Sequence, residues 1–514
     1  MKRPAQWNFA ASLVERLGHG SELLDAPSGE RFAAAELSTA IADFAATFAA
    51  AGLRHGDRVL IGCNLRALSS LAYLGAMFGG LVAVPVNENT LAGSGEALAR
   101  KTRARAVWTE RGIRPDWAAR CGLSELEGRP PRAGCDNAAP AACSEHDLAA
   151  LMATSGSSAA PRLVKVSHGN LIANTEAIIR SQRLGRDERA LLILPVSYCF
   201  GASVLHTHLW QGGAVVFDSR FTFPDKVLRA IAHYGCTSFA GVPTAYQILL
   251  RRSNIRSIPL PSLRRFLQAG GALGVASIRQ MRAIVPHAGF FVMYGQTEAT
   301  ARISCLPPER LADKAGSVGV PLDNVMVRIV GADGEDVPAG ESGELCVAGK
   351  SISAGYLDEP EETRRRFRGG WLATGDIASR DADGYLWITG REGEFLKMCG
   401  IRVGFAEIEA SVAAVPGVLE CAALAVPHAE AGEALALFVV AAAEADDVIA
   451  AVRRGLPAKC ICDSITRVAQ LPRNAHGKLI RSQLPRLARH ALPGDEIRAR
   501  ASESSRPAEE ISRT

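Results

Sequence analysis

The sequence predicts an α/β protein with a small α+β unit near its end, and two observations support this. Over the first 150 residues, helical and strand patterns alternate, which is typical of a parallel sheet covered by helices. Near the end of the chain, apolar strands alternate with helices; the strands are Val418–Val426 and Ala434–Ala442, and the helices Asp446–Arg454 and Arg481–Arg489. The length of 514 residues suggests roughly three structural units.

The first region shows this alternation element by element. We expect helices at Phe32–Ala51, Leu68–Phe78 and Glu96–Lys101, and strands at Arg58–Cys63, Leu81–Val86 and Ala104–Trp108. The uncharged stretch 67–86 is long enough to span a bilayer. Because Gly79, Gly80 and Pro85 interrupt it, we interpret it as a helix followed by a buried strand, and we expect no membrane segment.

Composition and charge exclude several classes of protein. The hydrophobic content of 48% and charged content of 22% are ordinary for a soluble globular protein. The net charge of +5 is mild and the basic residues do not cluster, so we do not expect nucleic acid as a partner. The 12 cysteines are scattered, and Lys2 and Arg3 are not followed by the apolar core of a signal peptide. We therefore expect reduced thiols in a cytoplasmic protein.

A Ser/Gly-rich loop is the first candidate for chemistry. The apolar strand LAALMA leads into Thr154, and Ser155, Gly156, Ser157, Ser158 and Arg162 follow. Small residues let backbone N–H groups approach a ligand, and hydroxyls beside a cation suit polyphosphate oxygens. The alternative is a solvated linker, and no Gly-Lys-Ser/Thr sequence closes the loop as in a P-loop.

Further motifs follow this loop in order: QAGGA at 268–272, MYGQTE at 293–298, WLATGD at 371–376, GREGEFLK at 390–397 and LPRNAHGK at 471–478. Together they resemble the adenylate-forming superfamily, which includes acyl- and aryl-CoA synthetases, carrier-protein adenylation domains and firefly-type luciferases. The family loop is roughly TSG[ST]TGxPKG, and here Ala159, Arg162 and Leu163 depart from it. Gly393 and Glu394 stand where the family usually has Lys and Asp.

The resemblance covers residues from about 30 to 490 and implies a domain organisation. We expect an adenylating domain of several subdomains at 1–390, including a small β-subdomain, and a mobile α+β lid at 391–494. The composition of residues 495–514 predicts a disordered tail.

The resemblance also assigns the nucleotide site. Gly270, Gly271 and Ala272 would let adenine lie against the backbone, although turn glycines are the alternative. Tyr294, next to Gly295, would stack on adenine; Thr297 would contact phosphate, and Glu298 would hold Mg²⁺. Asp376 and Arg391 would contact the ribose, although an Asp after Gly is also a common turn residue.

The remaining assignments concern the acid, the hinge and the thiol. Tyr198, Phe200 and Gly201 would line the acid pocket or simply fill the core. No acidic residue occurs between Ala190 and Phe217, so we expect acids with uncharged tails and not α-amino acids. Glu394 would be the hinge, Gly400 would border the thiol tunnel, and Lys478 would be the catalytic lysine.

The implied reaction has two halves. A small carboxylic acid attacks the α-phosphate of ATP, giving acyl-AMP and pyrophosphate, and a thiol then displaces AMP. We expect the thiol of coenzyme A. Two alternatives stay open: the phosphopantetheine of an acyl carrier protein as the acceptor, and a nucleotide-binding homologue with little catalysis. A luciferase-like oxygenase has no positive support in the sequence.

Overall fold

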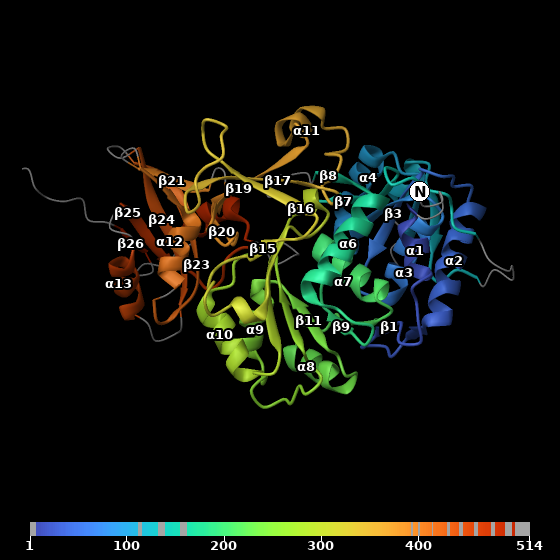
Figure 1. Ribbon diagram of the computed structural model, residues 1–514, viewed down its shortest axis with the longest axis horizontal. Coiled ribbons are helices and arrows are strands. Elements are labelled where there is room, and N and C mark those ends of the chain that lie inside the picture. Colours follow the sequence, from blue (N-terminus) through green and yellow to red (C-terminus); the bar gives the residue numbers. More distant parts are fainter. Residues whose placement is uncertain are drawn as a thin grey trace, which may run out of the picture. The chain divides into compact units, whose positions relative to one another are not determined.

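The structure, a computed structural model, describes residues 7–111, 116–131, 139–154, 162–391, 394–398, 401–413, 415–428, 432–441, 446–456, 461–473, 479–488 and 496–498. These residues form two compact units that divide between Ile388 and Thr389 (Figure 1). The motion of the smaller unit as a lid stays a prediction.

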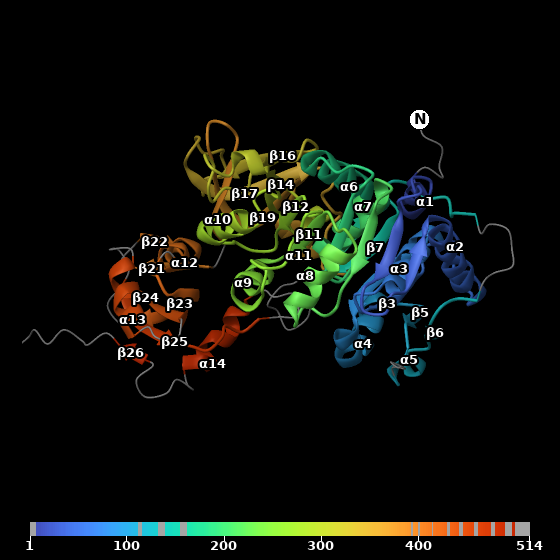
Figure 2. The ribbon, with the colours of Figure 1, turned by 90° about the horizontal axis from the view of Figure 1, so that it is seen from below.

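A mostly parallel sheet forms the first part of the larger unit, as the alternating patterns predict. Its strand order is β6 (Ser124–Glu127), β5 (Ala106–Thr109), β3 (Arg58–Cys63), β4 (Val82–Asn87), β7 (Leu148–Ala153) and β8 (Leu163–Ser167). The helices of this region are α2 (Ala34–Ala50), α3 (Ala67–Phe78), α4 (Glu88–Thr102) and α5 (Trp117–Arg120) (Figure 2). Strands β7 and β8 pair antiparallel, so the Ser/Gly-rich loop connects the two strands of a hairpin.

The uncharged stretch 67–86 is a helix followed by a strand, as the sequence predicts. Every residue of α3 is buried, and the helix ends at Gly79. Gly80 has a φ of +73°, a left-handed conformation that glycine adopts without steric strain, and it turns the chain toward β4. No helix in the described parts of the chain is long and apolar enough to cross a membrane.

The second sheet positions the predicted nucleotide motifs. Its strand order is β15 (Val320–Pro321), β14 (Ser304–Leu306), β13 (Gly289–Tyr294), β12 (Arg265–Gln268), β11 (Ser238–Gly241), β9 (Arg189–Leu192), β10 (Ala214–Phe217), β1 (Glu22–Asp25) and β2 (Arg31–Ala33). Strands β12 and β13 are parallel neighbours. Because the carboxyl ends of parallel strands meet at one edge, the motifs that follow β12 and β13 lie together there.

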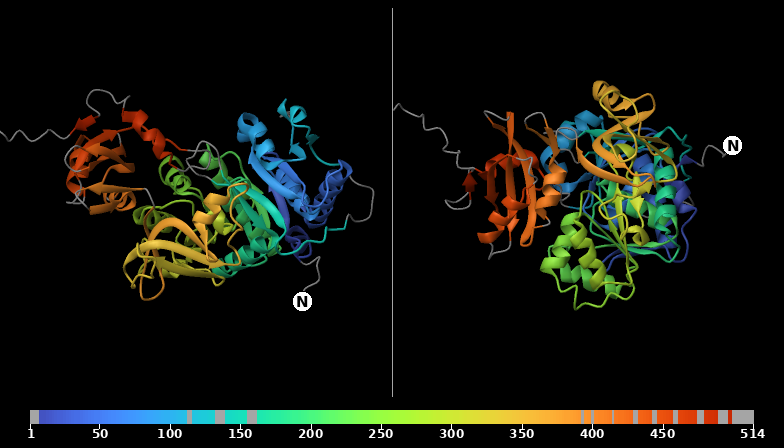
Figure 3. Two further views of the ribbon diagram at one scale, coloured as in Figure 1. Left: turned by 90° about the horizontal axis from the view of Figure 1, so that it is seen from above. Right: turned by 60° about the vertical axis from the view of Figure 1, so that its left-hand side comes forward.

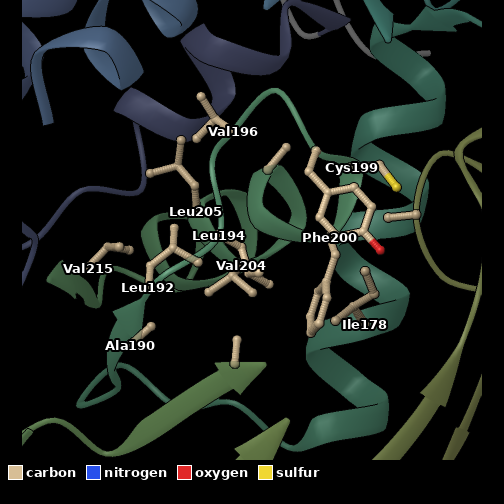
Figure 4. Packing of buried hydrophobic residues seen from close by; sticks show 14 of the residues in the cluster. Ile178, Ala190, Leu192, Leu194, Val196, Cys199, Phe200, Val204, Leu205 and Val215 are labelled. Atoms are coloured by element: carbon tan, nitrogen blue, oxygen red, sulfur yellow. The ribbon is translucent and has the colours of Figure 1, made fainter. Parts of the chain in front are cut away.

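Helices accompany the second sheet. They are α1 (Phe9–Val14), α6 (His168–Gln182), α7 (Cys199–Trp210), α8 (Pro224–His233), α9 (Pro243–Arg252) and α10 (Val275–Ile284). Two short 3₁₀ turns, η2 (Thr297–Ala299) and η3 (Pro308–Arg310), follow β13 and β14. One cluster of buried hydrophobic residues joins α6, α7 and strands β9 to β13. Figure 4 shows part of this cluster.

A small antiparallel sheet follows, as the predicted β-subdomain requires. Its order is β16 (Val325–Val330), β17 (Ser342–Gly349), β19 (Trp371–Arg380) and β18 (Phe367–Arg368). Helix α11 (Pro360–Arg366) lies in sequence between β17 and β18. Strand β20 (Leu386–Arg391) pairs with β19 and leads the chain into the smaller unit.

The smaller unit is α+β, as predicted (Figure 3). It has its own cluster of buried hydrophobic residues. Its sheet has the order β22 (Ile401–Gly404), β21 (Phe395–Met398), β24 (Gly432–Ala441), β25 (Cys462–Arg467) and β26 (Glu496–Arg498), and β23 (Val418–His428) pairs with β24. The helices are α12 (Phe405–Ala413) and α13 (Asp446–Gly455). The helix expected at Arg481–Arg489 is a 3₁₀ turn, η4 (Arg481–Gln483), followed by a short α14 (Leu484–Ala488).

The predicted disordered tail at 495–514 needs a correction. Residues 496–498 form strand β26, which pairs antiparallel with β25 through Ser464–Arg498 and Thr466–Glu496. A polar composition does not prevent this, because an open sheet edge offers backbone hydrogen bonds to any suitable segment. Residues 499–514 lie outside the described residues.

Candidate active site

Two motifs that are distant in the sequence meet at the end of β13. The hydroxyl of Tyr294 donates a hydrogen bond to Oδ2 of Asp376 on β19, with an oxygen–oxygen distance of 2.5 Å. A Cβ on the adjacent Gly295 would lie 1.9 Å from the carbonyl oxygen of Ala301, so this position excludes a side chain. Tyr294, predicted to stack on adenine, and Asp376, predicted to contact the ribose, are therefore direct neighbours.

Glu298, the predicted Mg²⁺ ligand, is held by a residue that the sequence did not reveal. The hydroxyl of Tyr356 donates to Oε1 of Glu298 at 2.7 Å. Burial and the neighbouring Glu298 raise the pKa of Tyr356, so the phenol stays protonated as a donor. Oε2 of Glu298 has no hydrogen-bond partner among the described residues. A half-buried, oriented carboxylate with a free oxygen fits the preference of Mg²⁺ for oxygen ligands.

Thr297 is oriented differently from what a phosphate contact requires. Its side chain is buried, and its hydroxyl donates to Sγ of Cys199 at 3.5 Å, within the limits for a sulfur acceptor. The hydroxyl therefore faces the first turn of α7 in this structure. Its phosphate contact stays a prediction.

The phosphate loop is described only at its two ends. Ser155, Gly156, Ser157 and Ser158 lie outside the described residues. The backbone N–H of Thr154 donates to the carbonyl oxygen of Arg162 at 2.9 Å, which closes the base of the hairpin.

Arg162, the cation expected beside the polyphosphate, is paired with acids instead. Its Nε lies 3.1 Å from Oε2 of Glu359, and its Nη1 lies 3.3 Å from Oε1 of Glu362. The Arg162 side chain is 40% exposed, and exposed ion pairs contribute only about 0–1 kcal/mol. A phosphate group could therefore replace these carboxylates at little cost.

The glycines after β12 pack against the predicted acid pocket. Gly270 has a φ of +87°, and a Cβ there would lie 2.7 Å from the hydroxyl oxygen of Tyr198. The side chain of Gln268 donates to the carbonyl oxygen of Gly271 at 2.7 Å, and Gly271 and Ala272 are exposed. One side of this turn, at Gly271 and Ala272, is therefore exposed, and Gly270 on the other side contacts Tyr198 of the predicted acid pocket.

That wall is built at the start of α7. Tyr198 is the N-cap residue of the helix, and its ring meets the ring of Phe200 edge-on with centroids 6.3 Å apart. A Cβ on Gly201 would lie 2.3 Å from the carbonyl oxygen of Pro195, so the helix packs tightly against the preceding loop. Figure 4 shows Cys199 and Phe200 among the buried residues of this cluster.

Arg302 brings a charge to this wall that the sequence analysis missed. The residue is 2% exposed, and its guanidinium carbon lies 4.7 Å from the centroid of the Phe200 ring. Burial lowers the pKa of Arg302 from its ordinary value. The prediction of an uncharged wall considered residues 190–217, whereas this cation comes from the segment between β13 and β14.

Arg366 is a second missed residue, and it connects the two nucleotide motifs. Its Nη2 donates to the carbonyl oxygen of Thr374 at 2.6 Å and to Oε1 of Gln296 at 3.4 Å. A Cβ on Gly375 would lie 2.8 Å from its Nη1. One guanidinium therefore bridges YGQTE and TGD, and in the sequence it is a member of the run Arg364–Arg366 that resembles a solvated surface.

The smaller unit holds the predicted hinge residue. The backbone N–H of Glu394 donates to the carbonyl oxygen of Arg391 at 2.8 Å, and its Oε2 lies 3.2 Å from Nε of Arg481. Arg391 is exposed. Gly400 and Lys478 lie outside the described residues, so their roles stay predictions.

Comparison with known proteins shows two family patterns in the chain. The pattern described as AMP-binding enzyme matches residues 16–357, and that of the AMP-binding enzyme C-terminal domain matches residues 407–478. Feruloyl-CoA synthase from an Amycolatopsis species is 34% identical over 466 residues, covering 88% of this chain and 93% of the relative. Sulfoacetate–CoA ligase from Cupriavidus necator is 30% identical over 498 residues, covering 90% and 94%.

Solved structures show the same fold. ATP-bound MatB from Rhodopseudomonas palustris matches with a TM-score of 0.84 and 26% identity, covering 94% of this chain and 98% of that one. O-succinylbenzoate coenzyme A synthetase from Bacillus subtilis, in complex with ATP and magnesium, matches with a TM-score of 0.81 and 24% identity, covering 93% and 99%. The second likeness concerns the fold alone.

Proposed function

The chain belongs to the AMP-binding enzyme family, and from this premise we propose that it is an AMP-forming ligase that joins a carboxylic acid to the thiol of coenzyme A. The observation that carries the proposal is the Tyr294–Asp376 hydrogen bond, which brings YGQTE and TGD into one site. The relatives named above are CoA ligases, which favours coenzyme A over a carrier protein as the acceptor.

In the first half-reaction, an acid carboxylate attacks the α-phosphorus of ATP and pyrophosphate leaves. Tyr294 flanks the adenine, and the carboxylate of Asp376 accepts hydrogen bonds from the ribose hydroxyls. Glu298, oriented by Tyr356, would hold Mg²⁺, whose charge would offset that of the departing pyrophosphate. Lys478 contributes a cation where negative charge accumulates in the transition state.

In the second half-reaction, the thiol attacks the acyl carbon of the mixed anhydride and AMP leaves. We assign this step to the smaller unit, with a change of backbone conformation at Glu394 and passage of the thiol beside Gly400. The relatives differ in the acyl groups in their names, feruloyl in one and sulfoacetate in the other, so they leave the acid open.

ATP–pyrophosphate exchange with a panel of carboxylic acids tests the first half, with Glu298→Gln as the inactive reference. Single-turnover transfer to coenzyme A or to a phosphopantetheinylated carrier protein tests the second. We expect exchange with at least one acid and a coenzyme A thioester. Transfer to the carrier alone would favour a carrier-loading enzyme, and nucleotide binding without exchange would favour the weakly catalytic alternative.

A further inference from the structure

Strand β19 bulges at the motif that carries Asp376. The register between β17 and β19 shifts there, so that Leu345 of β17 faces the three residues 374–376 of β19. Gly375, in the middle of the bulge, has a φ of +70°, a left-handed conformation that favours glycine. A bulge bends a strand and changes the direction of a side chain, and bulges are frequent beside active sites. The position of the Asp376 carboxylate therefore depends on how the bulge is held.

Two side chains hold this bulge. The hydroxyl of Thr374 donates to the carbonyl oxygen of Leu345 at 2.6 Å and accepts from the backbone N–H of Asp376 at 3.1 Å. The carbonyl oxygen of Thr374 accepts a hydrogen bond from Nη2 of Arg366 at 2.6 Å. Arg366 is the last residue of α11, and it is only 9% exposed. Helix α11 therefore supplies a contact to the bulge that the paired strands do not.

The same guanidinium also reaches the nucleotide motif. Its Nη2 donates to Oε1 of Gln296 at 3.4 Å, and a Cβ on Gly375 would lie 2.8 Å from its Nη1. Gln296 follows Tyr294 by two residues, and the hydroxyl of Tyr294 donates to the Asp376 carboxylate. Arg366 therefore contacts both motifs close to the point where they meet.

Burial indicates that Arg366 acts through these motifs. Its Nε is buried and has no hydrogen-bond partner among the described residues. An incompletely satisfied guanidinium is costly to bury, and an apolar side chain of similar size would cost less. What the guanidinium adds over an apolar side chain is its hydrogen bonding to Thr374 and Gln296.

We propose that Arg366 is a positioning residue for the ribose. By holding the bulge, it fixes the Asp376 carboxylate where the ribose hydroxyls reach it, and it thereby sets how strongly the protein prefers ribonucleotides to deoxyribonucleotides. This inference rests on the proposed role of Asp376 in binding the ribose. Hydrogen bonds weaken steeply when their distance and angle depart from the preferred geometry, so a small displacement of the carboxylate is sufficient to lose them.

The test is nucleotide binding without acid or coenzyme A. Isothermal titration calorimetry with Mg²⁺ present gives the Kd of ATP, 2′-deoxyATP and 3′-deoxyATP for the wild type, Arg366→Met and Arg366→Lys. Met keeps an extended side chain without donors, whereas Lys keeps the charge and a donor without the planar fork. Arg364→Met is the matched control, because Arg364 lies on the same helix and is exposed. The melting temperature of each variant reports whether it folds.

We expect the wild type to bind ATP about 10–100-fold more tightly than either deoxynucleotide, the factor for a hydrogen bond to a charged acceptor. Arg366→Met should lower this preference by about tenfold, the lower end of the loss typical for residues that orient a metal ligand. It should do so by weakening ATP binding and leaving the deoxynucleotides unchanged. Arg366→Lys should retain part of the preference and Arg364→Met all of it.

The pattern across the three nucleotides decides the outcome. Equal weakening of all three in Arg366→Met would overturn the proposal, because a general loss of structure or a direct contact with the phosphates would give that result. An unchanged preference would also overturn it. Arg366→Lys supplies the same comparison if Arg366→Met does not fold.

A double-mutant cycle separates this inference from the proposed function. Asp376→Asn should reduce the preference, and Arg366→Met added to it should reduce it no further, because Arg366 acts through Asp376. Additive losses would overturn the positioning role. An Asp376→Asn variant with the wild-type preference would refute the ribose contact, and the inference would fail with it. If the preferences are as expected but no acid supports pyrophosphate exchange, the proposed ligation fails and the role of Arg366 is retained.

Discussion

Removing the hydroxyl of Tyr356 should weaken the enzyme's use of Mg²⁺ without unfolding it. Tyr356→Phe deletes the donor that lies 2.7 Å from Oε1 of Glu298. The ring keeps its edge-on contact with Phe367, at a centroid distance of 5.8 Å, and its place beneath Arg162. A hydrogen bond to a charged group contributes about 1.5–3 kcal/mol. Loss of a residue that orients a metal ligand typically reduces metal affinity or activity by about 10–100-fold, which agrees with that energy.

The assay is the initial rate of pyrophosphate exchange as a function of Mg²⁺ concentration. We expect the apparent Mg²⁺ affinity or the limiting rate of Tyr356→Phe to fall by about 10–100-fold. Tyr73→Phe is the matched control, because the Tyr73 hydroxyl is buried without a hydrogen-bond partner among the described residues. Its removal should leave the rate unchanged and the protein as stable or more so. The reasoning is refuted if Tyr356→Phe matches the wild type, or if both variants lose the same activity.

The remaining predictions concern single side chains. Glu298→Gln should abolish acyl-AMP formation with an unchanged melting temperature, and exchange at the wild-type rate would show that Glu298 is not the metal ligand. Lys478→Ala should block acyl-AMP formation but still convert supplied acyl-AMP to the thioester. Glu394→Pro, which removes the N–H that donates to the carbonyl oxygen of Arg391, should form acyl-AMP but no thioester. Single-turnover assays of each half-reaction test this, and an equal loss of both half-reactions in both variants would exclude a swinging lid. Burial lowers the pKa of His206 to about 3 from an ordinary 6.5. Between these two pH values the unfolded chain is protonated at His206 and the folded chain is not, so the free energy of unfolding decreases as the pH drops below 6.5. His206→Phe should reduce the acid-dependent loss between pH 7 and 5 by about 2 kcal/mol in urea titrations, and an unchanged pH dependence would contradict this.

Local patterns in the sequence were sufficient for much of the fold. The strand predicted at Arg58–Cys63 has the same bounds in the structure, and the uncharged stretch after it divides at Gly79 as expected. The helix expected at Glu96–Lys101 is instead α4 (Glu88–Thr102), because Asn87 caps it through a side-chain bond to the N–H of Asn89. Strand β26 escaped prediction because its partner, β25, is distant in the sequence.

The sequence by itself determined the identity and order of the motifs, because each is a short run whose residue types carry the chemistry. It placed Tyr294, Asp376 and Glu298 in one predicted site, and the structure brings the first two into contact. It could not determine which charges are compensated. A carboxylate or guanidinium acts through what surrounds it within a few ångströms, and those neighbours come from distant segments. Tertiary structure alone decided that Arg162 is paired with acids and that Arg302 is buried without one, because burial and charge pairing depend on packing and not on the local sequence.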